Sequence, residues 1–152
     1  MPEYSNGGIL FNPDPIIVES PYNPITAGSE GSASISDAEG NPILSASNGY
    51  LYSTSQNCGG ALITPMPITL TSNKSATQGH LILPHYSDIN KYFIITVAHS
   101  GILVQFLGWG IVDFSGSECG TYSHGGFFLD NGETEKLTAC RIDGENGYWI
   151  LT

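Results

Sequence analysis

The sequence predicts an all-β protein built from antiparallel meanders, and three observations support that class. Its apolar residues gather in short runs rich in β-branched and aromatic side chains, separated by Gly, Pro and Asn. Only 12% of the residues are charged, whereas 19 are Gly and 9 are Pro, so turn-forming residues are abundant. No window places apolar residues at i, i+3, i+4 and i+7 over three turns, and we therefore expect less than ~10% helix.

The segment Gly79–Phe114 is the most densely apolar part of the chain and predicts a three-stranded meander with a turn at Ala98–Gly101. None of the 21 residues between Lys91 and Asp113 is charged, a length that would suit a membrane-spanning helix. The β-branched and aromatic composition favours strands instead. The run Tyr92–Val97 does not alternate between apolar and polar residues, so we expect a sheet packed from both sides.

The chain divides into an N-terminal arm and one all-β domain. Residues 1–31 contain five prolines and predict an extended Pro-rich arm with one short edge strand at Ile16–Val18, since Pro cannot donate to a strand ladder. Residues 32–152 are numerous enough to form a single domain with its own core.

The first part of the domain predicts a hairpin and a third strand. Ala33–Ser36 and Ile43–Ala46 flank a turn that contains Gly, and Tyr50–Thr54 follows the tight-turn signal Asn48-Gly49. Residues 55–78 then read as a long loop because Gly and Pro recur in them.

The last part of the domain predicts one more loop and one more hairpin. Residues 115–135 are rich in Gly and Ser, interrupted by the apolar trio Phe127–Leu129. The hairpin joins Lys136–Ile142 to Tyr148–Leu151, and the sequence ends one residue later. An end so close to a strand is expected of a cut made inside a longer fold.

Three stretches carry a resemblance to a known family: ASISDAEGNPILSASNGYLY (33–52), SATQGHLILPHYSDINKYFIITV (75–97) and TEKLTACRIDGENGYWIL (134–151). In order and spacing they resemble the N-terminal repeat region of the large gliding-motility-associated surface proteins exported by type IX secretion. The resemblance implies a β-propeller-like array of four-stranded meanders, about two blades in all, with approximate units 32–78, 79–114 and a partial 115–152. Because a closed propeller needs at least four blades, we expect strand edges to be exposed.

Charge and targeting signals restrict the partners and the location. Four Lys and Arg against 14 Asp and Glu give a formal net charge of −10, which argues against nucleic acid and against an anionic membrane as partners, and no membrane insertion is expected. A cation or a carbohydrate stays compatible with this charge. No export signal is visible at the start. We expect an extracellular or cell-surface protein, exported as a piece of a longer chain or released by lysis as a virion protein.

Three cysteines, Cys58, Cys119 and Cys140, show no metal-binding spacing and cannot all pair within one chain. They are interpreted as buried thiols or as one disulfide with a thiol left over.

The titratable residues do not form a recognisable catalytic or metal motif. Those that could in principle form a zinc or general-base cluster are His80, His85, His99, His124, Asp88 and Asp113. No pair has H-x-x-x-H or H-E-x-x-H spacing. We expect solvated turn residues, with His85 and Asp88 in one turn and His99 in another.

Ca²⁺ is a weak possibility at two turns. Asp37 with Glu39 and Asp143 with Glu145 lie beside turn glycines, but neither pair has the EF-hand order. Ordinary β-turns are expected, and no cofactor is predicted.

The sequence gives no indication of an enzyme. Ser123–Gly126 superficially resembles the glycines of an oxyanion loop, but the chain has no G-x-S-x-G elbow. Aromatic residues could stack on sugar rings, although strand spacing favours core and inter-sheet packing. They are Tyr50, Tyr52, Tyr86, Tyr92, Trp109, Tyr122, Tyr148 and Trp149.

Two function hypotheses follow. The first is a non-catalytic structural or interaction module of a surface assembly, and the second is a glycan- or receptor-binding module of a phage or adhesin fibre. We expect a homo-oligomer or fibre, because two strand edges carry no Lys or internal bulge-forming Gly that would block pairing. The candidates for pairing between chains are Ile16, Ile17, Val18, Tyr148, Trp149, Ile150 and Leu151.

Overall fold

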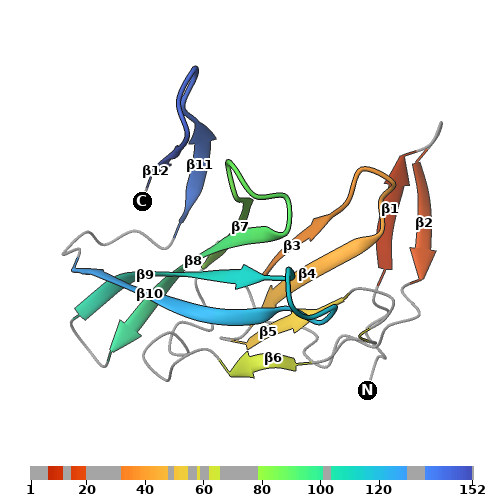
Figure 1. Cartoon of the computed structure of the whole chain (residues 1–152). Helices are drawn as coiled ribbons and strands as arrows, with labels where there is room; N and C mark the ends of the chain where they lie inside the picture. The colour runs from red at the N-terminus through yellow and green to blue at the C-terminus, as the bar shows by residue number, and fades with distance from the viewer. Residues whose placement is uncertain are drawn as a thin grey trace.

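The computed structural model describes residues 7–11, 15–19, 32–47, 50–54, 58, 62–65, 79–100, 104–129 and 136–151. Every regular element within these residues is a β-strand, and the strand pairs are antiparallel (Figure 1). The predicted all-β class is therefore confirmed. No helix in the described part of the chain is long and apolar enough to cross a membrane.

The first sheet has the strand order β3-β4-β5-β6. Its strands are β3 (Ala33–Ser36), β4 (Pro42–Ser47), β5 (Tyr50–Ser53) and β6 (Leu62–Pro65). The predicted hairpin and third strand are confirmed, while β6 lies in a stretch predicted as loop. It is only four residues long and pairs with β5 through an irregular register, which gives it a weak sequence signal. The turn signal Asn48-Gly49 lies outside the described residues.

The second sheet has the order β10-β9-β8-β7 and contains the longest strands. Its strands are β7 (His80–Pro84), β8 (Lys91–Ser100), β9 (Val104–Asp113) and β10 (Thr121–Leu129). The predicted three-stranded meander is confirmed, and β10 extends it at the β9 edge.

Two predictions about this sheet are wrong. Residues 115–135 are not all loop, because β10 pairs with β9 along its length apart from a bulge between His124 and Gly126. The second unit therefore reaches Leu129 instead of ending at residue 114. His99 is not a turn residue either, since β8 continues through it and it lies opposite Gln105. Its polarity suggested a turn, but the strand pairing overrides that local preference.

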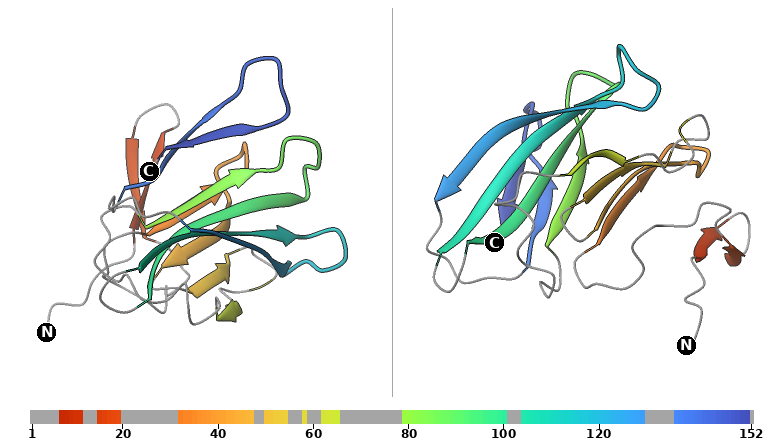
Figure 2. Two further views of the ribbon diagram at one scale, coloured as in Figure 1. Left: turned by 90° about the vertical axis from the view of Figure 1, so that its left-hand side faces the viewer. Right: turned by 90° about the horizontal axis from the view of Figure 1, so that it is seen from below.

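The two four-stranded sheets stack face to face, with β3 and β4 against β7 and with β6 against β10 (Figure 2). Their shared core contains fully buried Leu44, Leu51 and Val112. Burial of such side chains contributes roughly 1.5–3 kcal/mol each, so this core is a main source of stability.

A C-terminal hairpin covers the opposite face of the second sheet. It consists of β11 (Thr138–Arg141) and β12 (Tyr148–Leu151), as the sequence predicted. Buried Ile95, Val97 and Leu137 form a second core there. The two faces of β8 thus contact two different cores, which confirms that the run Tyr92–Val97 belongs to a sheet packed from both sides.

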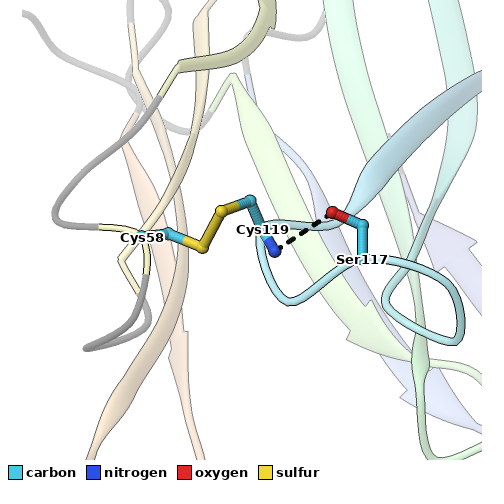
Figure 3. Close-up of a disulfide and its surroundings, with 3 residues drawn as sticks. All are labelled: Cys58, Ser117 and Cys119. Carbon is cyan, nitrogen blue, oxygen red and sulfur yellow. Dashed lines mark hydrogen bonds between the residues drawn. A yellow bond between two sulfur atoms is a disulfide. The ribbon is translucent and has the colours of Figure 1, made fainter.

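A disulfide joins the two four-stranded sheets at one end (Figure 3). Cys58 lies between β5 and β6, and Cys119 lies in the β9–β10 turn, where its backbone N–H donates to Ser117 Oγ at 3.3 Å. Cys140 is a free and exposed thiol. One disulfide with one thiol left over is therefore the correct alternative of the two that the sequence left open.

The N-terminal region contains a hairpin, β1 (Gly7–Phe11) and β2 (Pro15–Glu19). The strand predicted at Ile16–Val18 lies within β2, and it pairs with residues 8–10 of the same chain, a second strand that the sequence did not predict. The density of Pro suggested a lone strand, yet only three residues separate β1 from β2, a length that suits a hairpin loop. The hairpin forms its own two-stranded sheet.

Candidate functional site

An apolar groove of about 220 Å³ lies between the second sheet and the β11–β12 hairpin. We call it the hairpin groove. Its lining residues are Leu83, Tyr86, Phe93, Ile95, Leu107, Trp109, Gly147, Tyr148 and Ile150. They come from β7, β8, β9, the β7–β8 turn and the C-terminal hairpin, so the groove exists only because that hairpin stacks on the sheet.

Aromatic rings fix one end of the hairpin groove. The His85 ring stacks on Tyr86 and on Phe93, with ring centroids 4.5 and 4.8 Å apart. The Tyr148 hydroxyl donates a hydrogen bond to the carbonyl oxygen of Pro84 at 2.9 Å. This bond ties β12 to the end of β7 and holds the hairpin at a fixed distance from the sheet.

Trp109 lies across β10 because two glycines leave room for its ring. A Cβ atom at Gly125 would come within 2.4 to 2.5 Å of the Trp109 ring, and Gly126 has a φ of 146° at the bulge. Gly125 and Gly126 in the segment Ser123–Gly126 therefore position an aromatic side chain of the groove.

We expect Gly125→Ala to destabilise the protein by about 1–3 kcal/mol, because the added methyl group forces the Trp109 ring to move. The matched control is Gly116→Ala, since a Cβ there meets nothing within 4 Å. Urea unfolding followed by tryptophan fluorescence gives both the stability and the change in the Trp109 environment. Equal losses of stability in Gly125→Ala and Gly116→Ala would contradict the close packing of the Trp109 ring against Gly125.

The outer edge of β12 carries unpaired backbone groups. The Ile142 N–H donates to the Gly147 carbonyl, so by antiparallel alternation Trp149 and Leu151 bond inward to β11. The N–H and C=O groups of Tyr148 and Ile150 then point away from β11. Among the described strands, none pairs with β12 on that side.

The face of β12 that points away from the second sheet is also apolar. Trp149 is 62% exposed and Leu151 is 56% exposed, and the cross-strand neighbour of Trp149 is the exposed Cys140. These exposed apolar side chains thus lie on the strand that forms the open edge of the sheet.

The histidines and aspartates that were considered for a zinc or general-base cluster are distributed as follows. Asp88 and Asp113 come together, but Lys91 Nζ lies between them at 3.1 and 3.4 Å. A backbone hydrogen bond from Asn90 and then the hydrogen bond from Lys91 hold the pKa of Asp88 below its usual value. This arrangement is a solvated ion pair that closes a turn.

The four histidines lie on different parts of the second sheet: His80 in β7, His85 in the β7–β8 turn, His99 in β8 and His124 in β10. His85 lies in the predicted turn, where it stacks on aromatic rings, and His124 is exposed on β10 against Phe127. His80 is buried in β7 with its Nδ1 3.1 Å from Thr96 Oγ1, so the expectation of a solvated turn residue is wrong for it. His99 is the strand residue noted above.

The two turns considered for Ca²⁺ are β-turns between paired strands. Asp37 uses its carboxylate inside its own turn, accepting from the side-chain amide of Asn41 at 2.9 Å as well as from backbone N–H groups. Gly40 and Gly144 have φ values of 87° and 72°, which the turns require. In the part of the chain that the structure describes, no group of three or more His, Cys, Asp or Glu side chains could hold a metal ion.

The aromatic residues singled out in the sequence fall into three groups. Tyr52 is buried in the first sheet, and Tyr92 and Tyr122 pack on the first core. Tyr86, Trp109 and Tyr148 line the hairpin groove, whereas Tyr50 and Trp149 are exposed. Leu83, Phe93, Ile95 and Leu107 also line the groove, and no sequence motif marked them. The lack of alternation in β8 was the signal that could have pointed to this face.

No protein-family model matches the chain, and neither a curated protein nor a solved structure matches it. The function is therefore argued from the chain's own geometry.

Proposed function

We propose that the protein is a non-catalytic structural or interaction module of an extracellular or cell-surface assembly. Copies of it would join into a homo-oligomer or fibre by pairing strands between chains. The observation that carries this proposal is the open edge of β12. Two sheets of the chain have four strands each, whereas the sheet formed by β11 and β12 has only two.

The repeated architecture supports an assembly role. Each sheet buries a face against the next, as in repeat proteins whose units depend on their neighbours. Both four-stranded sheets are meanders that run in the same order, which agrees with the resemblance to the blade-like repeats of type IX surface proteins. A third unit left at two strands exposes an edge that another chain can complete.

The Cys58–Cys119 disulfide supports the extracellular or surface location. Disulfides persist in oxidising compartments and are rare in the cytosol. This one links two sheets across 61 residues, so it restrains the stacking on which the repeat depends.

We expect Ile150→Pro to abolish assembly, because proline removes the N–H that β12 presents at its open edge. Ile150→Ala is the matched control, since it loses the side-chain packing but keeps the N–H. Light scattering at high micromolar concentration measures the mass of each variant. A wild-type chain that stays monomeric would contradict the proposed function, and a proline variant that still assembles would contradict the use of this edge.

Glycan or receptor binding is the second candidate, favoured by the aromatic side chains of Tyr86, Trp109 and Tyr148 in the hairpin groove. Sugar rings stack on such side chains but also need hydrogen bonds for their hydroxyl groups. The rest of the lining is mainly aliphatic, which suits an apolar protein segment better. Binding on a glycan array that is lost in Trp109→Ala would favour this second function instead.

A further inference from the structure

We infer that the β1–β2 hairpin of a second copy completes the sheet begun by β11 and β12, with β2 lying beside β12. This inference rests on the proposed self-association and names the segment that performs it. The completed sheet would have the order β11-β12-β2-β1, four strands like the other two sheets of the chain.

The acceptor lacks two strands. The first and second sheets stack with β3 against β7 and β6 against β10, so the first and last strands of one sheet lie near those of the other. If the β11–β12 sheet stacks on the second sheet in the same way, two further strands beside β12 would lie over β9 and β10. There Trp109 and Leu107 line the groove, and both side chains are only half-buried. Apolar surface and an open strand edge thus occur at the same place.

The donor has two strands that need a sheet. β1 and β2 are each five residues long and pair with each other in a separate two-stranded sheet. An isolated two-stranded hairpin is at best marginally stable in water. In sequence, Ile9-Leu10-Phe11 and Ile16-Ile17-Val18 are apolar at consecutive positions, a pattern typical of strands covered on both faces.

The composition of the hairpin favours β2 as the strand next to β12. β2 contributes three consecutive β-branched residues, Ile16–Val18, which suit an interior strand. Its Pro15 is the first residue of the strand, a position that tolerates the missing N–H. β1 begins with Gly7-Gly8, which weakens it as an interior strand and suits the sheet edge.

The donor belongs to another copy because the two hairpins lie at opposite ends of the molecule. β1–β2 lies beyond the first sheet and β11–β12 lies beyond the second, with both sheets between them (Figures 1 and 2). A contact between unlike ends is heterologous, so it repeats from copy to copy into a ring or an open filament.

Disulfide trapping between two full-length variants tests this pairing. All variants carry Cys140→Ser, so that the native free thiol does not react. One chain carries Trp149→Cys on the exposed face of β12, and the other carries Ile16→Cys, Ile17→Cys or Val18→Cys. Leu151→Cys is a second acceptor in case the first variant folds poorly. The controls are Gly116→Cys in an exposed turn and Leu10→Cys on the far strand.

We expect mixed dimers from β2 to exceed those from either control by about tenfold, because a disulfide requires Cα atoms within ~7 Å. We also expect Ile17→Cys to differ from both its neighbours, since side chains alternate along a strand. Trapping from Leu10→Cys instead of β2, or equal trapping from Gly116→Cys, would overturn the inference. So would dimers of Trp149→Cys with itself, although these would leave the proposed self-association intact. A protein that stays monomeric in every variant and in the wild type would refute both the pairing of β2 with β12 and the proposed self-association.

Discussion

Replacing Cys58 and Cys119 together by serine is expected to destabilise the protein by about 4 kcal/mol. The disulfide closes a loop with a sequence separation of 61, and opening it returns that conformational freedom to the unfolded chain. It also joins the first sheet to the β9–β10 turn of the second sheet, so the stacked core between the sheets loses its covalent restraint. Guanidinium unfolding of the oxidised protein and of the double variant measures the difference.

The matched control is Cys140→Ser, because that thiol is free and exposed. A surface substitution of this kind should change the free energy of unfolding by less than about 0.5 kcal/mol. Wild-type protein kept in reductant should behave like the double serine variant. A double variant that unfolds at the wild-type guanidinium concentration would show that the disulfide contributes little to the stacking of the sheets.

The parts of the fold that the sequence predicted are those with a strong local signal. The hairpin β3–β4 has the turn Asp37–Asn41, in which the Asp37 carboxylate accepts from the backbone N–H groups of Glu39 and Asn41. β8 shows no alternation from Tyr92 to Val97, and this feature alone predicted a sheet with two covered faces. The C-terminal hairpin has a turn rich in Asp, Asn and Gly between two apolar runs.

The parts that were missed depend on distant contacts. β10 contains Gly125 and Gly126, which are poor strand formers alone but leave space for the Trp109 ring from β9. β1 was missed because Pro and Gly near it outweighed its three apolar residues. Cys58 and Cys119 could not be paired from three cysteines whose positions in space were unknown.

The candidate site could be predicted at its edge but not in its interior. Tyr148–Leu151 is a short apolar strand with no residue that blocks pairing, and this is visible in the sequence. The hairpin groove combines side chains that lie up to 67 positions apart, from Leu83 to Ile150, and only the stacking of the hairpin brings them together. The same limit applies to His80, whose burial no local pattern indicated.

Lowering the pH from 6.5 to 4 is expected to destabilise the protein by about 3 kcal/mol through His80 alone. Burial lowers the pKa of His80 from 6.5 to about 4, because the charged imidazolium is poorly solvated inside the sheet. The unfolded chain therefore binds a proton in this range that the folded chain does not. The stability that depends on a neutral His80 is therefore complete above pH 6.5 and is lost as the pH falls towards 4. No charged neighbour contributes to this pKa shift.

His80→Asn should flatten this part of the pH profile, since the amide does not titrate and can still bond to Thr96 Oγ1. His124→Asn makes the same replacement at an exposed histidine and serves as the matched control. Hydrogen bonds lower the pKa values of Asp37, Asp88 and Asp113, so these aspartates also lose stabilisation as the pH falls below about 5, but this loss is common to the three proteins and cancels in the comparison. Urea unfolding at intervals from pH 7.5 to 4 measures the three proteins. Equal slopes for the wild type and His80→Asn would show that His80 is not held neutral in the folded sheet.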